Sequence, residues 1–214
     1  YRGQNWNPGQ RAPLTEPGVD AREGDYLIRV DGAEVRGTDE LYRAFENTAG
    51  KQVELVLSAN ADGSNARTMT VVPIANEGQL RQLSWIEANR RRVEERSGGK
   101  LGYIYMPNTG GQGMASFDRD FYSQLDKQGL VIDERFNGGG QVADYVIGVL
   151  SSPVYSYWLN REGWLAQSPF FSFDGPKVMV TNEYAGSGGD WMPWTFQRRK
   201  VGKLVGMRTW GGLV

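Results

Sequence analysis

The stretch that decides the predicted fold reads Lys177-Val178-Met179-Val180-Thr181-Asn182-Glu183-Tyr184-Ala185-Gly186-Ser187-Gly188-Gly189-Asp190. Its first five residues predict a buried strand, and the residues after Ser187 have a helical pattern. Glycines on both sides of Ser187 let the backbone turn sharply and let a ligand approach closely. The helix that follows adds free backbone N–H groups and its positive dipole end. Ser187 is therefore the best candidate nucleophile in this sequence.

Two interpretations of Ser187 stay open on this pattern alone, because serine often caps a helix N-terminus. Ala185 stands where a Gly-x-Ser-x-Gly motif has its first glycine, which disfavours an α/β-hydrolase elbow. Asp190 is either a first-turn carboxylate favoured by the helix dipole or a group that lines the site, and the structural role is favoured. The sequence contains 0 histidines, so whatever activates Ser187 is either not a histidine or not on this chain.

A second glycine-rich turn reads Asp133-Glu134-Arg135-Phe136-Asn137-Gly138-Gly139-Gly140-Gln141 and also comes directly after an apolar strand pattern. Three consecutive glycines can form a nest of N–H groups that holds an anion. A phosphate site is one interpretation, but neither Gly-x-Gly-x-x-Gly nor a Walker ending is present. The other is an oxyanion hole for acyl transfer, with one N–H each from Gly140 and Gly188.

The second part of the chain alternates between strand and helix patterns. The predicted strands cover residues 101–106, 129–133, 177–181 and 203–206, and the predicted helices cover residues 113–126, 142–150 and 187–199. This alternation predicts βαβ units and a mostly parallel sheet. Functional groups in such sheets gather at the carboxyl ends of the strands, where both glycine-rich turns fall.

Residues 1–76 predict a smaller β-rich module with a PDZ-like order of elements. The predicted strands cover residues 26–30, 33–35, 52–57 and 68–74, with a tight turn at Asp31-Gly32. Thr38 is expected to cap a short helix. Residues 77–83 are expected to form a hinge, and Ser84 a capping box that opens a helix to about Arg96. The domains expected are thus residues 1–76 and 77–214.

One segment, between residues 150 and 177, predicts an irregular connection. Its aromatic residues either line an apolar pocket or pack on the sheet as part of a loop; they are Tyr155, Tyr157, Trp158 and Trp164.

Composition narrows the function classes. The 214 residues include 24 basic and 25 acidic side chains, so no nucleic-acid or membrane partner is expected. No apolar run approaches the roughly 20 residues that a membrane-spanning helix needs, and a cytoplasmic location is expected. With 0 cysteines and 0 histidines, neither a metal nor another cofactor is expected.

With these residues located, the chain resembles the PDZ and catalytic-core segments of the tricorn protease group, relatives of the C-terminal processing (tail-specific) serine peptidases. The matching segments follow the family order over nearly the whole chain, at residues 13–20, 23–27, 135–140, 182–190 and 206–212. The resemblance implies that Ser187 is the nucleophile and that the backbone N–H groups of Gly188 and Gly140 form the oxyanion hole. It implies a fold of α/β and β class, with a PDZ-like β module before a crotonase-like α/β core.

Two departures from the family pattern bear on the mechanism. The bacterial processing peptidases pair the serine with a lysine, but Gly212 stands at that position and cannot accept a proton. The tricorn branch uses a histidine from a segment before the PDZ module, oriented by a serine, and a glutamate beyond the catalytic serine. We therefore expect an incomplete fragment that lacks the first PDZ strand and these residues, and that is inactive or nearly so when isolated.

The function that the resemblance implies is hydrolysis of peptides or unfolded proteins through an acyl-enzyme on Ser187, in a parent protein that forms homo-oligomers. Two alternatives are a PDZ module that binds peptides beside a catalytically silent core, and a crotonase-type enzyme acting on an acyl-CoA thioester.

Overall fold

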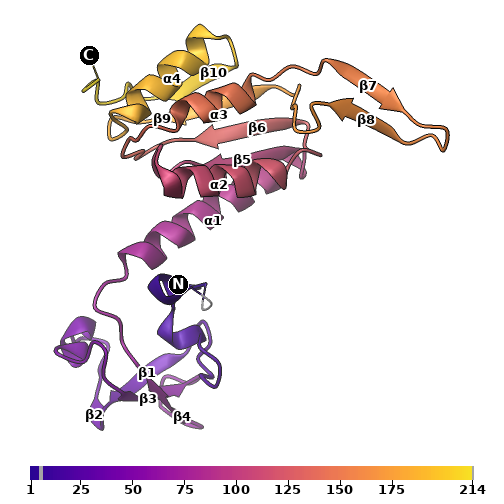
Figure 1. The fold of residues 1–214 in the computed structure, drawn as a ribbon. Helices are drawn as coiled ribbons and strands as arrows, with labels where there is room; N and C mark the ends of the chain where they lie inside the picture. Colours follow the sequence, from indigo (N-terminus) through magenta and orange to yellow (C-terminus); the bar gives the residue numbers. More distant parts are fainter. Residues whose placement is uncertain (5–6, 214) are drawn as a thin grey trace. The chain divides into compact units, whose positions relative to one another are not determined.

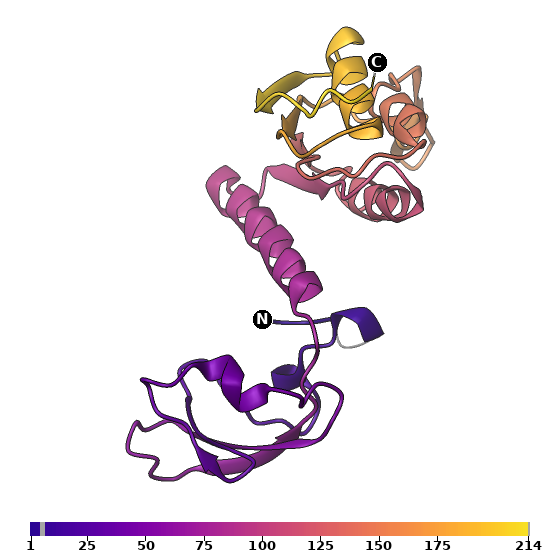
Figure 2. The ribbon, with the colours of Figure 1, turned by 90° about the vertical axis from the view of Figure 1, so that its left-hand side faces the viewer.

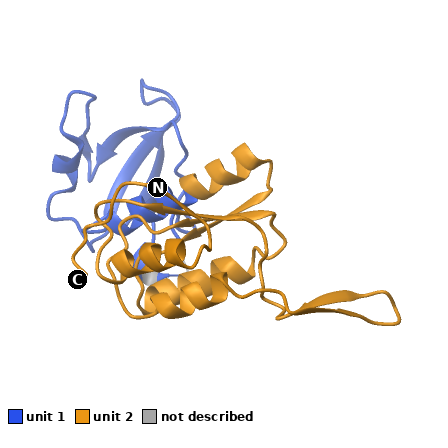
Figure 3. Ribbon diagram, turned by 90° about the horizontal axis from the view of Figure 1, so that it is seen from above, with its two compact units in different colours: residues 1–87 blue, residues 88–214 orange. Residues whose placement is uncertain are grey.

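A computed structural model describes residues 1–4 and 7–213 of the chain, and its elements form a mixed α/β fold (Figure 1). The chain divides into two compact units, Tyr1–Glu87 and Ala88–Val214 (Figure 3). Each unit has its own sheet and its own core. The expected domain boundary after residue 76 stays a prediction.

The first unit contains a four-stranded antiparallel sheet in the order β2-β1-β3-β4. Its elements are the 3-10 helices η1 (Pro8–Gln10), η2 (Pro13–Thr15) and η3 (Leu41–Phe45), and the strands β1 (Tyr26–Val30), β2 (Ala33–Glu34), β3 (Val53–Ser58) and β4 (Arg67–Val71). Val53, Leu55 and Leu57 alternate along β3 and are buried, so one face of that strand packs on the core of the unit.

Two expected helix starts are wrong. Glu40, not Thr38, caps η3, because its carboxylate accepts the N–H groups of Tyr42 at 3.3 Å and Arg43 at 3.0 Å. Helix α1 (Gly78–Ser97) includes most of the expected hinge and begins six residues before Ser84. The side chain of Asn76 accepts the N–H of Gly78 at 2.6 Å. That bond satisfies one of the free donors of the first turn, as a cap does.

The second unit contains a parallel sheet in the order β10-β9-β6-β5, as the alternation predicted. Its strands are β5 (Leu101–Tyr105), β6 (Gly129–Asp133), β9 (Lys177–Thr181) and β10 (Lys203–Gly206), and its helices are α2 (Gly111–Tyr122), α3 (Ala143–Leu150) and α4 (Gly188–Arg198). Helices α2, α3 and α4 lie on one side of these strands (Figure 2).

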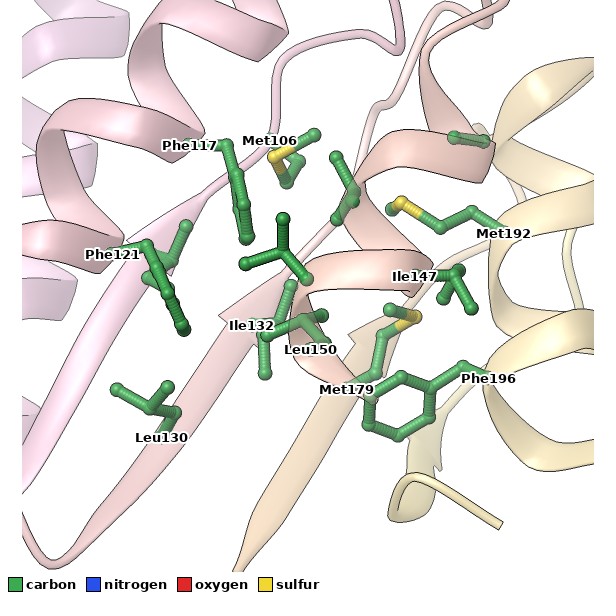
Figure 4. Close-up of a cluster of buried hydrophobic side chains, with 14 of the residues drawn as sticks. Met106, Phe117, Phe121, Leu130, Ile132, Ile147, Leu150, Met179, Met192 and Phe196 are labelled. Carbon is green, nitrogen blue, oxygen red and sulfur yellow. The ribbon is translucent and has the colours of Figure 1, made fainter. Parts of the chain in front are cut away.

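The core between the sheet and these helices is one apolar cluster (Figure 4). Ile104, Ile132 and Met179 lie side by side across three strands and have no exposed surface. Phe117 of α2 and Phe196 of α4 are buried against the same cluster. Each such side chain contributes about 1.5–3 kcal/mol to folding. This core fixes the positions of the loops that leave β5, β6 and β9.

The segment expected to be irregular contains a two-stranded antiparallel hairpin, so that prediction is wrong. Strands β7 (Ser156–Leu159) and β8 (Leu165–Ser168) pair around a turn that closes with Gly163 N–H on the Asn160 carbonyl. Trp158 and Trp164 are exposed by 64% and 61%, and they line a cavity of about 350 Å³ with Phe170. For Trp158 and Trp164 this placement agrees with the first of the two interpretations, in which the aromatic side chains of the segment line an apolar pocket.

Strands β5, β6 and β9 are parallel neighbours, so their carboxyl ends lie along one edge of the sheet. The triple-glycine turn leaves β6 there, and the Ser187 turn leaves β9. In the described part of the chain, no helix combines the length and the apolar character needed to cross a bilayer.

Candidate active site

Ser187 lies on the turn between β9 and α4, with an exposed side chain and backbone angles of φ 56° and ψ −117°. An ordinary N-cap residue has extended backbone angles. A residue other than glycine at positive φ costs of the order of 1–3 kcal/mol, and such strain is concentrated at functional sites. The backbone at Ser187 is therefore that of a strained turn that presents a side chain, rather than that of an ordinary cap.

Asp190 holds this turn in place. Its Oδ2 accepts the Ser187 N–H at 2.7 Å, and its Oδ1 accepts the N–H of Gly211 at 2.7 Å. The N–H groups of Gly212 and Leu213 also point to Oδ2, at 3.1 and 3.3 Å. Burial alone would raise the pKa of Asp190, but the N–H groups of Gly211, Ser187 and Leu213 and the Thr209 side chain together lower it. Asp190 thus has the structural role that the sequence favoured.

The triple-glycine turn lies directly against the Ser187 turn. A Cβ on Gly139 would lie 2.7 Å from the Cβ and 3.1 Å from the Oγ of Ser187. A Cβ on Gly188 would overlap the Gly140 carbonyl oxygen and would lie 2.9 Å from the Gly140 nitrogen. The three residues predicted for the site, Ser187, Gly188 and Gly140, are therefore neighbours, although 47 positions separate Gly140 from Ser187 in the sequence.

The backbone N–H groups of Gly140 and Gly188 donate no hydrogen bond to any other described residue. Gly188 is the first residue of α4, where helix geometry leaves the N–H without an intrahelical partner. Two free donors beside an exposed hydroxyl are what stabilisation of an oxyanion next to a serine nucleophile needs. Their roles in this chain stay a proposal.

Asn137 joins the two turns and was not predicted from the sequence as a site residue. Its side-chain oxygen accepts the N–H of Gly139 at 2.9 Å, and its carbonyl oxygen accepts the N–H of Gly186 at 3.1 Å. It has no exposed surface. The signal available in the sequence was an asparagine directly before the three glycines, since asparagine side chains often bond to the backbone two residues on in a turn.

A third loop, which leaves β5, completes this edge and was also missed. Thr109 donates its N–H to the Gly139 carbonyl at 2.9 Å and accepts the Val142 N–H at 2.7 Å. Its hydroxyl is buried, has no hydrogen-bond partner among the described residues, and lies where a Cβ on Gly188 would be. Thr109 is followed by a pair of glycines after a strand's carboxyl end, which is a signal of the same kind as the two glycine turns that predicted the site.

Asp133 and Glu134 are consecutive acidic residues at the start of the triple-glycine turn, and their environments differ. The buried Asp133 carboxylate accepts the Tyr103 hydroxyl at 2.8 Å and the Arg135 guanidinium at 2.6 Å, so its charge is matched. Glu134 has no exposed surface. Burial, reinforced by the charge of Asp190, raises its pKa to about 9. Glu134 is therefore neutral at pH 7, whereas Asp133 forms an ion pair.

Among the described residues, no three acidic side chains are grouped so as to hold a metal ion.

A strained serine at a strand–helix turn, with two free amide donors at its side, is the arrangement of the serine hydrolase class. Residues 100–214 match the family model described as "Peptidase family S41", and residues 1–76 match "Tricorn protease PDZ domain". The chain belongs to peptidase family S41. This membership does not favour either of the two alternatives. These are a PDZ module that binds peptides beside a catalytically silent core, and a crotonase-type enzyme acting on an acyl-CoA thioester.

Curated relatives and a solved structure agree with this family. The tricorn protease of Thermoplasma acidophilum is 39% identical over 215 residues, which cover 100% of this chain and 20% of the relative. A tricorn protease homolog of Saccharolobus solfataricus is 39% identical over 216 residues, covering 100% and 20%. The crystal structure of the tricorn protease matches with a TM-score of 0.85 and 38% identity, covering 100% of this chain and 21% of that one. The chain spans about one fifth of the length of the curated relatives it matches.

Proposed function

We propose that this chain carries the nucleophile and the oxyanion hole of a serine peptidase that hydrolyses peptides or unfolded proteins. The observation that carries the proposal is the contact between two glycine turns around an exposed serine with strained backbone. Membership of peptidase family S41 supports it. A crotonase-like topology for residues 77–214 and a separate PDZ-like domain at residues 1–76 belong to the same proposal.

In this mechanism the Ser187 hydroxyl attacks the scissile carbonyl, the C–N bond breaks, and the amine leaves with the proton that the general base took from Ser187. Water then hydrolyses the acyl-enzyme and frees the Ser187 hydroxyl. The N–H groups of Gly140 and Gly188 stabilise the tetrahedral oxyanion, and loss of one such donor costs about 10²–10³ in rate. A general base removes the hydroxyl proton, which is worth about 10²–10⁴. Since the sequence has 0 histidines, we propose that a histidine outside these 214 residues is that base, as in the tricorn branch.

The proposed partners are the peptide or unfolded-protein substrate and further copies of the same protein. The relatives with the highest identity reported above are named as tricorn proteases or their homologs, which supports a peptide substrate. A homo-oligomer and a cytoplasmic location are part of the proposal. Light scattering on the full-length gene product and fractionation of the cells that make it test these two points.

A fluorophosphonate probe on the full-length gene product tests the nucleophile. We expect the probe to label the wild-type protein at Ser187 and to leave Ser187→Ala unlabelled. Ser123→Ala, which removes an exposed hydroxyl at the end of α2, is the control and should be labelled like the wild type. Labelling that survives Ser187→Ala would overturn the assignment.

A further inference from the structure

Glu134 is a buried acid beneath the candidate site that the proposed mechanism does not use. It comes directly after β6 and has no exposed surface. One carboxyl oxygen, Oε2, receives a long contact of 3.4 Å from the Asn137 side-chain amide. The other, Oε1, is buried and has no hydrogen-bond partner among the described residues. A buried polar atom without a partner is rare enough to need an explanation.

Among the described residues, the side chain that donates a hydrogen bond to the Glu134 carboxyl is that of Asn137, which ties the two turns together. Through its side-chain oxygen Asn137 holds Gly139, and through its carbonyl it holds Gly186. Gly139 and Gly186 are the immediate neighbours of Gly140 and Ser187. A change at the Glu134 carboxyl therefore reaches both the triple-glycine turn and the Ser187 turn through Asn137.

The charges around Glu134 favour its neutral form. Burial is the largest cause of the raised pKa of Glu134. The charges of Asp190 and Asp133 raise it further, and the hydrogen bond from Asn137 opposes them. Asp133 is paired with Arg135, and Asp190 is held by backbone N–H groups, so neither negative charge is free to move away. Asp190 and Asp133 both act on Glu134 with a negative charge, so ionisation would place a third negative charge beside them.

We propose that Glu134 is a positioning residue whose buried carboxyl holds the two glycine turns at their catalytic spacing through Asn137. An ionised Glu134 would be an unsolvated charge beside Asp190. It would draw in water and attract the Asn137 amide more strongly, so both turns that Asn137 holds would shift. It would also place negative charge beneath the position where the oxyanion forms. The inference rests on the proposed function, because it assigns a role within that site.

Carbon-bound NMR signals of the 214-residue chain, labelled at the glycine Cα positions, test the coupling without any need for activity. As pH rises, the Cα signals of Gly139, Gly140 and Gly186 should shift together, with a common midpoint of about 9. Glu134→Gln keeps a neutral side chain of the same shape, so these shifts should be lost. Glu183→Gln removes an exposed carboxyl from the Ser187 turn and should leave the shifts unchanged.

The same shifts in Glu134→Gln, or shifts confined to one of the two turns, would overturn the proposal. Thermal unfolding of each variant, followed by circular dichroism, confirms that the spectra compare folded proteins.

A second readout uses the rate at which the fluorophosphonate labels the full-length gene product. Above a pKa of about 9 the wild-type rate should fall about tenfold per pH unit, whereas Glu134→Gln should keep a level rate. An equal fall in both proteins would contradict the role of Glu134. Absence of Ser187 labelling at every pH would instead count against the proposed function, which the NMR shifts do not measure.

Discussion

Gly138 and Gly140 are two positions apart, but a side chain would meet different surroundings at each. Gly140 has φ 138°, and a Cβ there would overlap the backbone of Thr109. Gly138 has open space within 4 Å and no positive φ. The triple-glycine motif therefore combines one position that tolerates a side chain with one that does not.

We expect Gly140→Ala to lower the free energy of unfolding by about 2 kcal/mol or more, because backbone strain and overpacking each cost about 1–3 kcal/mol. Gly138→Ala, the matched control, should stay within about 0.5 kcal/mol of the wild type. Urea denaturation of both variants measures the difference. Equal stabilities of Gly140→Ala and Gly138→Ala would show that the loop of Thr109 moves enough to accommodate the added methyl group.

The raised pKa of Glu134 also predicts how stability depends on pH. Between its ordinary pKa of 4.5 and the folded value of about 9, the folded chain keeps a proton that the unfolded chain has lost. The free energy of unfolding therefore falls as pH rises through this window, by at most about 1.4 kcal/mol per pH unit for this group. Glu134→Gln should remove this contribution, as urea denaturation at pH 5, 7 and 9 would reveal. Identical slopes in the two proteins would contradict the raised pKa.

At the scale of elements, β9 shows how one strand serves both the core and the site. Met179, in its middle, has no exposed surface, and the strand ends at Thr181, shortly before the turn that carries Ser187. We expect Met179→Ala to cost about 2–5 kcal/mol, since truncation of a buried methionine leaves a cavity.

Met207→Ala is the matched control, because this methionine is 63% exposed and its backbone bonds to Thr181 do not need its side chain. It should change stability by less than about 0.5 kcal/mol. Thermal or chemical denaturation compares the two variants. Similar losses in both would mean that β9 is less well packed than the buried Met179 indicates.

The elements that sequence reasoning missed share a cause. The start of α1 depends on Asn76 and on burial of Leu80 and Leu83, whereas the Ser-x-x-Glu pattern at Ser84 was the stronger local signal. The β7–β8 hairpin lies outside the apolar core cluster, so its aromatic side chains show no alternation between a buried and a solvated face. Local patterns predicted the elements that pack on the core and failed where a cap or an exposed hairpin decided the structure.

At the scale of the whole molecule, two cores with no shared residue stabilise the two units. Leu55 belongs to the cluster of the first unit, and Ile132 to that of the second. We expect Leu55→Ala to lower the hydrogen-exchange protection of β1, β3 and β4 and to leave β5, β6 and β9 unchanged, since distant sites contribute independently. Mass spectrometry of exchanged peptides measures this. Loss of protection in both sheets would show that the chain opens as one cooperative unit.

The sequence by itself determined the parallel sheet and the strand limits of β6, β9 and β10, and it predicted the three residues of the candidate site, whose roles stay a proposal. It could do so because apolar strand runs followed by glycine turns are local patterns, and parallel strands bring their carboxyl ends to one edge. The tertiary structure alone decided how these residues are held. The strained angles of Ser187, the link through Asn137, the Thr109 loop and the neutral state of Glu134 all depend on contacts between segments far apart in the chain. Hydrogen bonding and burial between such segments follow from packing, which no local pattern records.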